Sequence, residues 1–94
     1  METYVVCDTV EDGLRASEVT VGIKSTKGRT EFLHVSGSNL LVTDGRRYLA
    51  VGLVHVDPAT KQHLIQFPQE ADSGVNRIWV PDTSILPAAK VPVS

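Results

Sequence analysis

The most regular pattern in the chain is an alternation of apolar and polar residues over positions 18–24, where Val19, Val21 and Ile23 alternate with polar residues and glycine. A period of two residues is typical of a β-strand that buries one face. A second β-prone segment, 29–35, follows after a short polar stretch. The two segments therefore predict a β-hairpin.

The loop of this hairpin predicts its register. If residues 26–28 form a three-residue loop whose last residue, a glycine, is left-handed, then Val21 lies opposite Leu33. This register places the apolar residues of both strands on one face, and a slip by one residue would separate them. On the other face it places His34 opposite Thr20.

A second hairpin is predicted at Asp44-Gly45, because a two-residue type I′ turn requires positive φ at both central positions and Asp-Gly is a preferred pair there. The turn joins residues 40–43 to a long segment, 47–56, that is apolar on both faces. We expect this long strand to be buried on two sides. Gly52, near its middle, is expected to allow a sharp bend.

The fold class follows from spacing and composition. Turn signals recur every eight to twelve residues, which is typical of a small sandwich or barrel. Val, Ile and Thr make up 26 of 94 residues, a composition that favours strands. We predict an all-β fold, a small antiparallel SH3-like barrel of five to seven strands with a short C-terminal helical turn. An open β-sandwich is the alternative.

The predicted domain covers residues 1–86 and ends with a helical turn at 82–86 that packs against an open end of the barrel. Residues 87–94 contain two prolines and small side chains, so we expect an extended, flexible tail. Near the other end, Thr9 is a candidate N-cap for a short helix through Ser17. Gly13 disfavours that helix by about 1 kcal/mol, and we prefer a turn at 11–13.

Two histidines, His55 and His63, flank a predicted turn at 57–61. A five-residue loop would place them opposite each other as a two-histidine metal edge. A four-residue loop places His55 opposite Leu64, with the histidines on opposite faces. The turn sequence favours the four-residue loop, because Lys61 can end it in the left-handed region. We expect no metal and no cofactor, since a structural zinc needs four ligands.

No pair of residues has the pattern of a nucleophile beside its base. Cys7, the single cysteine, lies in an apolar run and is expected to be a small buried hydrophobe rather than a thiolate. Glu70 and Asp72 lie on a predicted loop, where carboxylates are usually solvated. We therefore predict that the chain is not an enzyme.

Charge is unevenly placed along the chain. The formal net charge of −2 argues against a globally basic nucleic-acid binder. Residues 1–20, however, carry −4 and residues 21–47 carry +3. If the hairpin tips lie on one side, their basic residues would form a patch for single-stranded nucleic acid. These residues are Lys24, Lys27, Arg29, Arg46 and Arg47.

Small β-barrels also bind peptides on exposed aromatic residues or at unpaired sheet edges. We expect a non-catalytic binding or assembly module for a protein or peptide partner, including self-association as a homodimer. An accessory nucleic-acid-binding barrel is the alternative. No secretory signal or membrane-spanning run is recognisable, so we expect a cytoplasmic protein without a membrane partner. The candidate binding residues are Phe32, Trp79, Tyr48, Arg46 and Arg47.

Overall fold

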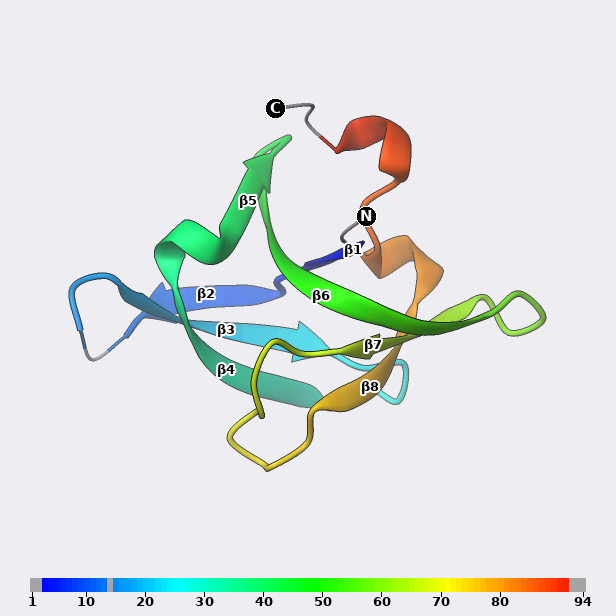
Figure 1. Cartoon of the computed structure of the whole chain (residues 1–94), viewed down its shortest axis with the longest axis horizontal. Helices are drawn as coiled ribbons and strands as arrows, with labels where there is room; N and C mark the ends of the chain where they lie inside the picture. The colour runs from blue at the N-terminus through cyan, green and yellow to red at the C-terminus, as the bar shows by residue number, and fades with distance from the viewer. Residues whose placement is uncertain (1–2, 14, 92–94) are drawn as a thin grey trace.

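The computed structural model describes residues 3–13 and 15–91. In this part of the chain, eight antiparallel β-strands and three short 3₁₀ turns form an all-β fold (Figure 1). The strands are β1 (Thr3–Val6), β2 (Thr9–Asp12), β3 (Glu18–Lys24), β4 (Thr30–Ser36), β5 (Leu40–Thr43), β6 (Arg46–Asp57), β7 (Gln62–Gln66) and β8 (Arg77–Pro81). The 3₁₀ turns are η1 (Gly37–Asn39), η2 (Asp82–Ser84) and η3 (Ala88–Lys90).

The strands form two sheets that are not joined into a closed barrel. Three strands, in the order β2-β3-β4, make one sheet. The other has five strands, with the path β1-β6-β7-β8 and β5 also paired to β6. The first half of β6 pairs with β1 and β5, and its second half pairs with β7. β6 changes partners at Gly52, where the sequence predicts a bend, and the strand is strongly curved (Figure 1).

Both hairpins predicted from their turns form with the expected registers. Val21 pairs with Leu33, and Gly28 ends the loop with a φ of 86°. Asp44 and Gly45 have φ values of 52° and 74°, as a type I′ turn requires. Local turn chemistry therefore sets the register of these strands.

The β6–β7 hairpin has the four-residue loop that we favoured. Asp57 pairs with Gln62, and His55 lies opposite Leu64. Lys61 ends the loop in the left-handed region, with a φ of 56°. This register places the two histidines of the hairpin on opposite faces. In the described part of the chain, no group of three or more His, Cys, Asp or Glu side chains is arranged to hold a metal ion.

The core lies between the inner faces of the two sheets and consists mainly of aliphatic side chains, with Phe67 among them. One charged side chain, Glu31, is buried with them among the described residues. Burial of aliphatic surface is the main stabilising contribution in a domain of this size. The large side chains that are fully buried are Ile23, Leu33, Leu49, Ile65, Val5, Val21 and Val80.

The number of strands differs from the prediction of five to seven, because Thr9–Asp12 is a strand rather than a helix or a turn. Asp8 explains this difference. Its backbone N–H donates to the carbonyl of Gly22 at 2.8 Å, and its carboxylate accepts the backbone N–H of Lys24 at 2.8 Å. These bonds lead the chain away from β1 and lay it along β3. The alternative of a helix through Ser17 is therefore wrong.

The end of the chain agrees with the prediction in part. The 3₁₀ turn at Asp82–Ser84 is confirmed, and Leu86, which follows it, is buried. Ala88–Lys90 forms another 3₁₀ turn where we expected extended chain, since the backbone N–H of Lys90 bonds back to the carbonyl of Pro87. Residues 92–94 of the predicted tail lie outside the described residues. No helix in the described ranges has the length and apolar character needed to cross a membrane.

Candidate functional site

The second half of β6 is exposed, and the prediction that this strand is buried on both faces is wrong there. Residues 48–51 are buried or half-buried, whereas residues 52–56 are exposed. Leu53, Val54 and Val56 expose 48%, 40% and 41% of their surface. Figure 1 shows the reason, because the β6–β7 hairpin extends beyond the body formed by the two sheets.

One edge of this exposed segment has no strand partner in the described part of the chain. β1 and β5 flank the first half of β6 and pair no further along it than Val51. β7 pairs with residues 52–57 along one edge only. Alternate residues of a strand direct their N–H and C=O groups to each edge. The other edge of residues 52–57, which we call the free edge of β6, therefore has no strand partner among the residues that the structure describes.

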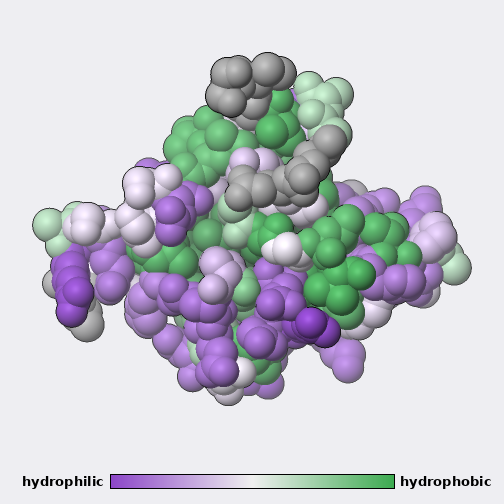
Figure 2. Space-filling model, in the orientation of Figure 1, coloured by the Kyte–Doolittle hydropathy of each residue, from purple (hydrophilic) through white to green (hydrophobic). Residues whose placement is uncertain are grey.

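Over residues 52–56 the free edge lacks the charged residues that usually protect such strands, and Asp57 stands at its end. From Tyr48 to Val56 the sequence contains no Asp, Glu, Lys or Arg. Natural edge strands are commonly blunted by lysine, proline or a bulge, because an apolar unpaired edge is a template for pairing with another chain. Of these protecting devices, the segment has a β-bulge between Leu53 and His55, and its apolar side chains nevertheless remain exposed. Figure 2 shows hydrophobic surface over this part of the molecule, on its right side.

A row of side chains with two aromatic members crosses β6, β7 and β8. The registers align His55 of β6, Leu64 of β7 and Trp79 of β8 across one face. The ring centroids of His55 and Trp79 are 6.1 Å apart at an interplanar angle of 90°. Trp79 exposes 37% of its surface. This sheet therefore carries both the free edge and an accessible indole ring.

A shallow apolar groove borders the segment on its other face. It has a volume of about 360 Å³ and runs from Leu53 to the C-terminal residues 85–88 and Val91. His63 also lines the groove, and its Nδ1 atom is buried without a hydrogen-bond partner in the part of the chain that is described. Leu53 thus belongs to the free edge and to the groove.

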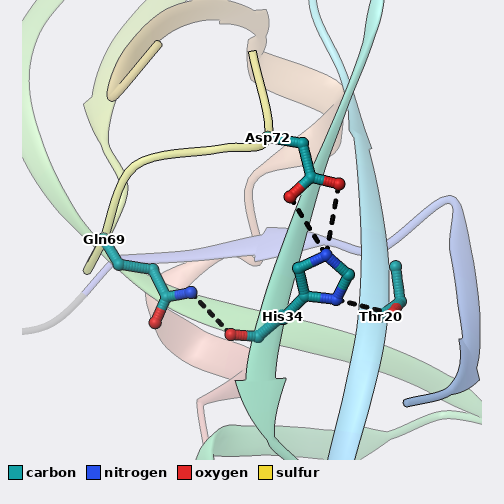
Figure 3. A network of polar contacts seen from close by, with 4 residues as sticks. All are labelled: Thr20, His34, Gln69 and Asp72. Atoms are coloured by element: carbon teal, nitrogen blue, oxygen red, sulfur yellow. Dashed lines mark hydrogen bonds and ion pairs between the residues drawn. The ribbon is translucent and has the colours of Figure 1, made fainter. Parts of the chain in front are cut away.

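The outer edge of β4 is covered, unlike the edge of β6, by the loop after β7 (residues 67–76). Figure 3 shows the polar contacts that fasten it. His34 Nδ1 lies 3.0 Å from Thr20 Oγ1, and its Nε2 lies 3.0 Å and 3.2 Å from the two carboxylate oxygens of Asp72. The side-chain amide of Gln69 donates to the backbone carbonyl of His34 at 2.6 Å.

Thr20, His34 and Asp72 have the residue types of a nucleophile, a base and a carboxylate relay. They lie at the surface, however, and fasten the loop to the sheet. The His34 and Asp72 side chains expose 41% and 59% of their surface. Electrostatic stabilisation of a reacting oxyanion depends on preorganised donors in a water-excluded site. The contacts instead hold the loop on the sheet, where the backbone N–H of Asp72 also donates to the carbonyl of Phe32 at 2.8 Å.

A second clamp lies inside the same loop contact. The Ser73 hydroxyl donates to Glu31 Oε1 at 2.5 Å, and Arg29 Nε lies 3.1 Å from Glu31 Oε2. Our reading of the sequence missed Glu31 as a structural residue. The predicted register contains the signal, because it places Glu31 opposite Ile23 on the inner face.

The predicted aromatic residues are not gathered at one place. Phe32 exposes 43% of its surface on the three-stranded sheet, whereas Trp79 belongs to the five-stranded sheet. Within the described residues, the ring contact of Trp79 is with His55. Tyr48 is 8% exposed and packs in the interior, because it precedes the partner change in β6. It lines a pocket beside the C-terminal residues Ile85 and Pro87, away from Phe32 and Trp79.

The predicted basic residues are exposed but lie on two separate turns. Arg46 and Arg47 follow the β5–β6 turn at the top of Figure 1, and Lys24, Lys27 and Arg29 surround the β3–β4 turn at its lower right. Arg29 is also paired with the buried Glu31. The condition for a single basic patch, hairpin tips on one side, is not met.

Cys7 is partly buried and has the character expected from its apolar neighbours. Burial, and secondarily the nearby Asp8 carboxylate, raises the pKa of the Cys7 thiol to about 12. The thiol therefore stays protonated near neutral pH, which makes it a poor nucleophile and metal ligand.

Comparison of the chain with known protein families, curated proteins and solved structures found no match.

Proposed function

We propose that this protein is a non-catalytic binding or assembly module, and that an extended segment of a protein or peptide partner docks on the free edge of β6. The observation that carries the proposal is the combination, over residues 52–56, of exposure, apolar character and one edge without a strand partner in the described part of the chain. Addition of a strand to an open sheet edge is an established mode of peptide recognition.

The chemistry of the edge suits this mode. Backbone N–H and C=O groups of the partner would replace water on β6, and each such hydrogen bond contributes about 0.5–1.5 kcal/mol net. Side chains of the partner would cover Leu53, Val54 and Val56, and burial of apolar surface contributes roughly 25 cal/mol per Å². The backbone groups thus supply affinity and the apolar side chains supply selectivity for an uncharged segment.

The remaining expectations belong to the same proposal. We propose an SH3-like arrangement of the two sheets, supported by the backbone hydrogen bond from Thr26 N–H to the carbonyl of Trp79 at 2.8 Å, which links the β3–β4 turn to β8. We also propose that the protein acts in the cytoplasm and without a cofactor. Nothing in the arrangement of the basic side chains favours nucleic acid over a protein partner.

Selection from a random peptide display library tests the proposal. Val54→Lys places a charge on the free edge, and Val42→Lys is the matched control, since Val42 is 64% exposed on β5. We expect peptides enriched on the wild-type protein to be extended and apolar. They should bind Val42→Lys as they bind the wild type and should bind Val54→Lys at least about tenfold more weakly, a loss of about 1.4 kcal/mol.

Two results would contradict the proposal. One is enrichment of peptides that bind all three proteins equally, which would place the docking surface elsewhere. The other is the absence of any enriched peptide. Thermal unfolding of Val54→Lys near the wild-type temperature is the control that the substitution leaves the fold intact.

A further inference from the structure

A pocket outside the free edge of β6 lies between the β5–β6 turn and the C-terminal 3₁₀ turns. In Figure 1 these segments lie side by side at the top of the molecule, where η3 is red and the β5–β6 turn is green. The pocket has a volume of about 540 Å³, within the range of sites that bind small organic ligands. It shares no residue with 52–57, so its role is independent of the proposed function. The lining residues that determine its chemistry are Asp44, Arg46, Tyr48, Thr83, Leu86 and Lys90.

Two cationic side chains line the pocket and lack an anionic partner. Arg46 begins β6 and Lys90 ends η3, so segments far apart in the sequence bring the two charges to one place. Among the residues that the structure describes, neither side chain forms an ion pair. Asp44 is the one carboxylate among the described lining residues, which leaves a formal charge of +1 there. An anion in the pocket would therefore gain charge-assisted hydrogen bonds from both cations.

A tyrosine hydroxyl at this pocket also lacks a partner. Tyr48 is 8% exposed, and buried tyrosines usually find a hydrogen-bond partner for the hydroxyl. Within 3–13 and 15–91 the Tyr48 hydroxyl has none, yet it is not enclosed. Leu86, which is also buried, is a further lining residue. The pocket thus has an apolar interior with one phenolic donor, and Arg46 and Lys90 are exposed at its rim.

From these observations we infer that the pocket binds a small organic anion, whose phosphate or carboxylate group lies between Arg46 and Lys90 and accepts the Tyr48 hydroxyl. Guanidinium and ammonium groups bind both kinds of anion, and arginine does so in a bidentate geometry. The apolar part of the ligand packs on the Tyr48 ring and Leu86. The Thr83 hydroxyl is one more donor at the pocket. An uncharged ligand would leave both cations without a partner, so the charge of the lining selects an anion.

NMR titration of the full chain with phenyl phosphate, benzoate, inorganic phosphate and phenol tests the inference. We expect phenyl phosphate or benzoate to bind at least about tenfold more tightly than phenol, which has the ring without the anionic group. The tighter of the two identifies the anionic group. Inorganic phosphate, which has the charge without the ring, should bind at least about threefold more weakly than phenyl phosphate.

Substitutions separate the pocket from the surface at large. Arg46→Gln should weaken binding of the tighter probe about tenfold, whereas Arg47→Gln, the matched control on the other face of the strand, should not. Tyr48→Phe keeps the ring and removes the hydroxyl, and we expect a loss of roughly two- to tenfold. Asp44→Asn keeps a residue preferred in type I′ turns and removes the repelling charge, so it should tighten binding at least about twofold.

The inference is overturned if phenol binds as tightly as both anionic probes, or if no probe at millimolar concentration shifts the amide resonances of residues 44–48 and 83–90. It is also wrong if Arg47→Gln weakens binding as much as Arg46→Gln, since the anion would then respond to overall charge rather than to the pocket. Tighter binding by Asp44→Asn is a gain that a damaged fold does not produce, so the test stays decisive if another variant unfolds. None of these outcomes bears on peptide binding at the free edge of β6.

Discussion

The replacement Ser73→Ala tests which clamp holds the loop after β7 on the edge of β4. The Ser73 hydroxyl donates to Glu31 Oε1 at 2.5 Å, and the Glu31 side chain is only 5% exposed. Alanine leaves that carboxylate oxygen buried without its donor. An unsatisfied buried polar group costs about 1–3 kcal/mol, and more when it is charged.

Asp72→Asn is the matched comparison, because it weakens the exposed clamp on the same loop. The His34 and Asp72 side chains are 41% and 59% exposed, and exposed ion pairs contribute about 0–1 kcal/mol. A change of 1 kcal/mol shifts the unfolding temperature of a domain of this size by roughly 4–8 °C. We therefore expect Ser73→Ala to lower the Tm by roughly 4–24 °C, and Asp72→Asn to lower it by less.

Urea and thermal unfolding of the two single variants measure this difference. A double-mutant cycle of Ser73→Ala with Glu31→Gln isolates the interaction between the two side chains. If Asp72→Asn destabilises the protein as much as Ser73→Ala does, the reasoning from burial is wrong. In that case the exposed contacts of Figure 3 hold the loop.

Three further predictions concern single residues. The thiol of Cys7, with a pKa raised to about 12 by burial, should react with iodoacetamide at pH 8 far more slowly in the native protein than after unfolding in urea. Hydrogen bonds, chiefly from the Thr60 side chain, lower the pKa of Asp57 below 3.8. The stability that Asp57 adds to the β6–β7 turn is therefore complete above pH 3.8 and is lost as the pH falls through the lower pKa of the folded state. An NMR titration, with Asp57→Asn as control, would detect this loss. Gly22→Ala should cost about 1–3 kcal/mol in urea unfolding, because the new methyl group would clash with Thr9 Oγ1.

The parts of the fold that local chemistry determines were predictable from the sequence. The alternation at 18–24 and the left-handed Gly28 fix one hairpin, and Asp44-Gly45 fixes another. In each case the turn requires a backbone conformation that few residues adopt, so the turn residues and the strand pattern must agree. The loop that ends at Lys61 follows the same rule.

The burial of β6 could not be predicted, because it depends on which strands cover it. The run from Tyr48 to Val56 is apolar throughout, and a buried strand gives the same pattern as an exposed docking edge. Only the strand pairing shows that β1 and β5 flank β6 no further than Val51 and that β7 takes over from Gly52. Of the candidate aromatic residues, Trp79 lies on the candidate surface, whereas Tyr48 is in the interior.

The central claim is that the free edge of β6 is the docking surface. The most direct measurement is amide hydrogen exchange by NMR on the protein with and without a peptide selected from the library. The account predicts that amides within residues 52–57 gain protection when the peptide binds, while those of Thr9–Asp12 and Leu40–Thr43 keep their exchange rates. Protection that develops on β2 or β5, with the amides of 52–57 unchanged, would contradict the claim.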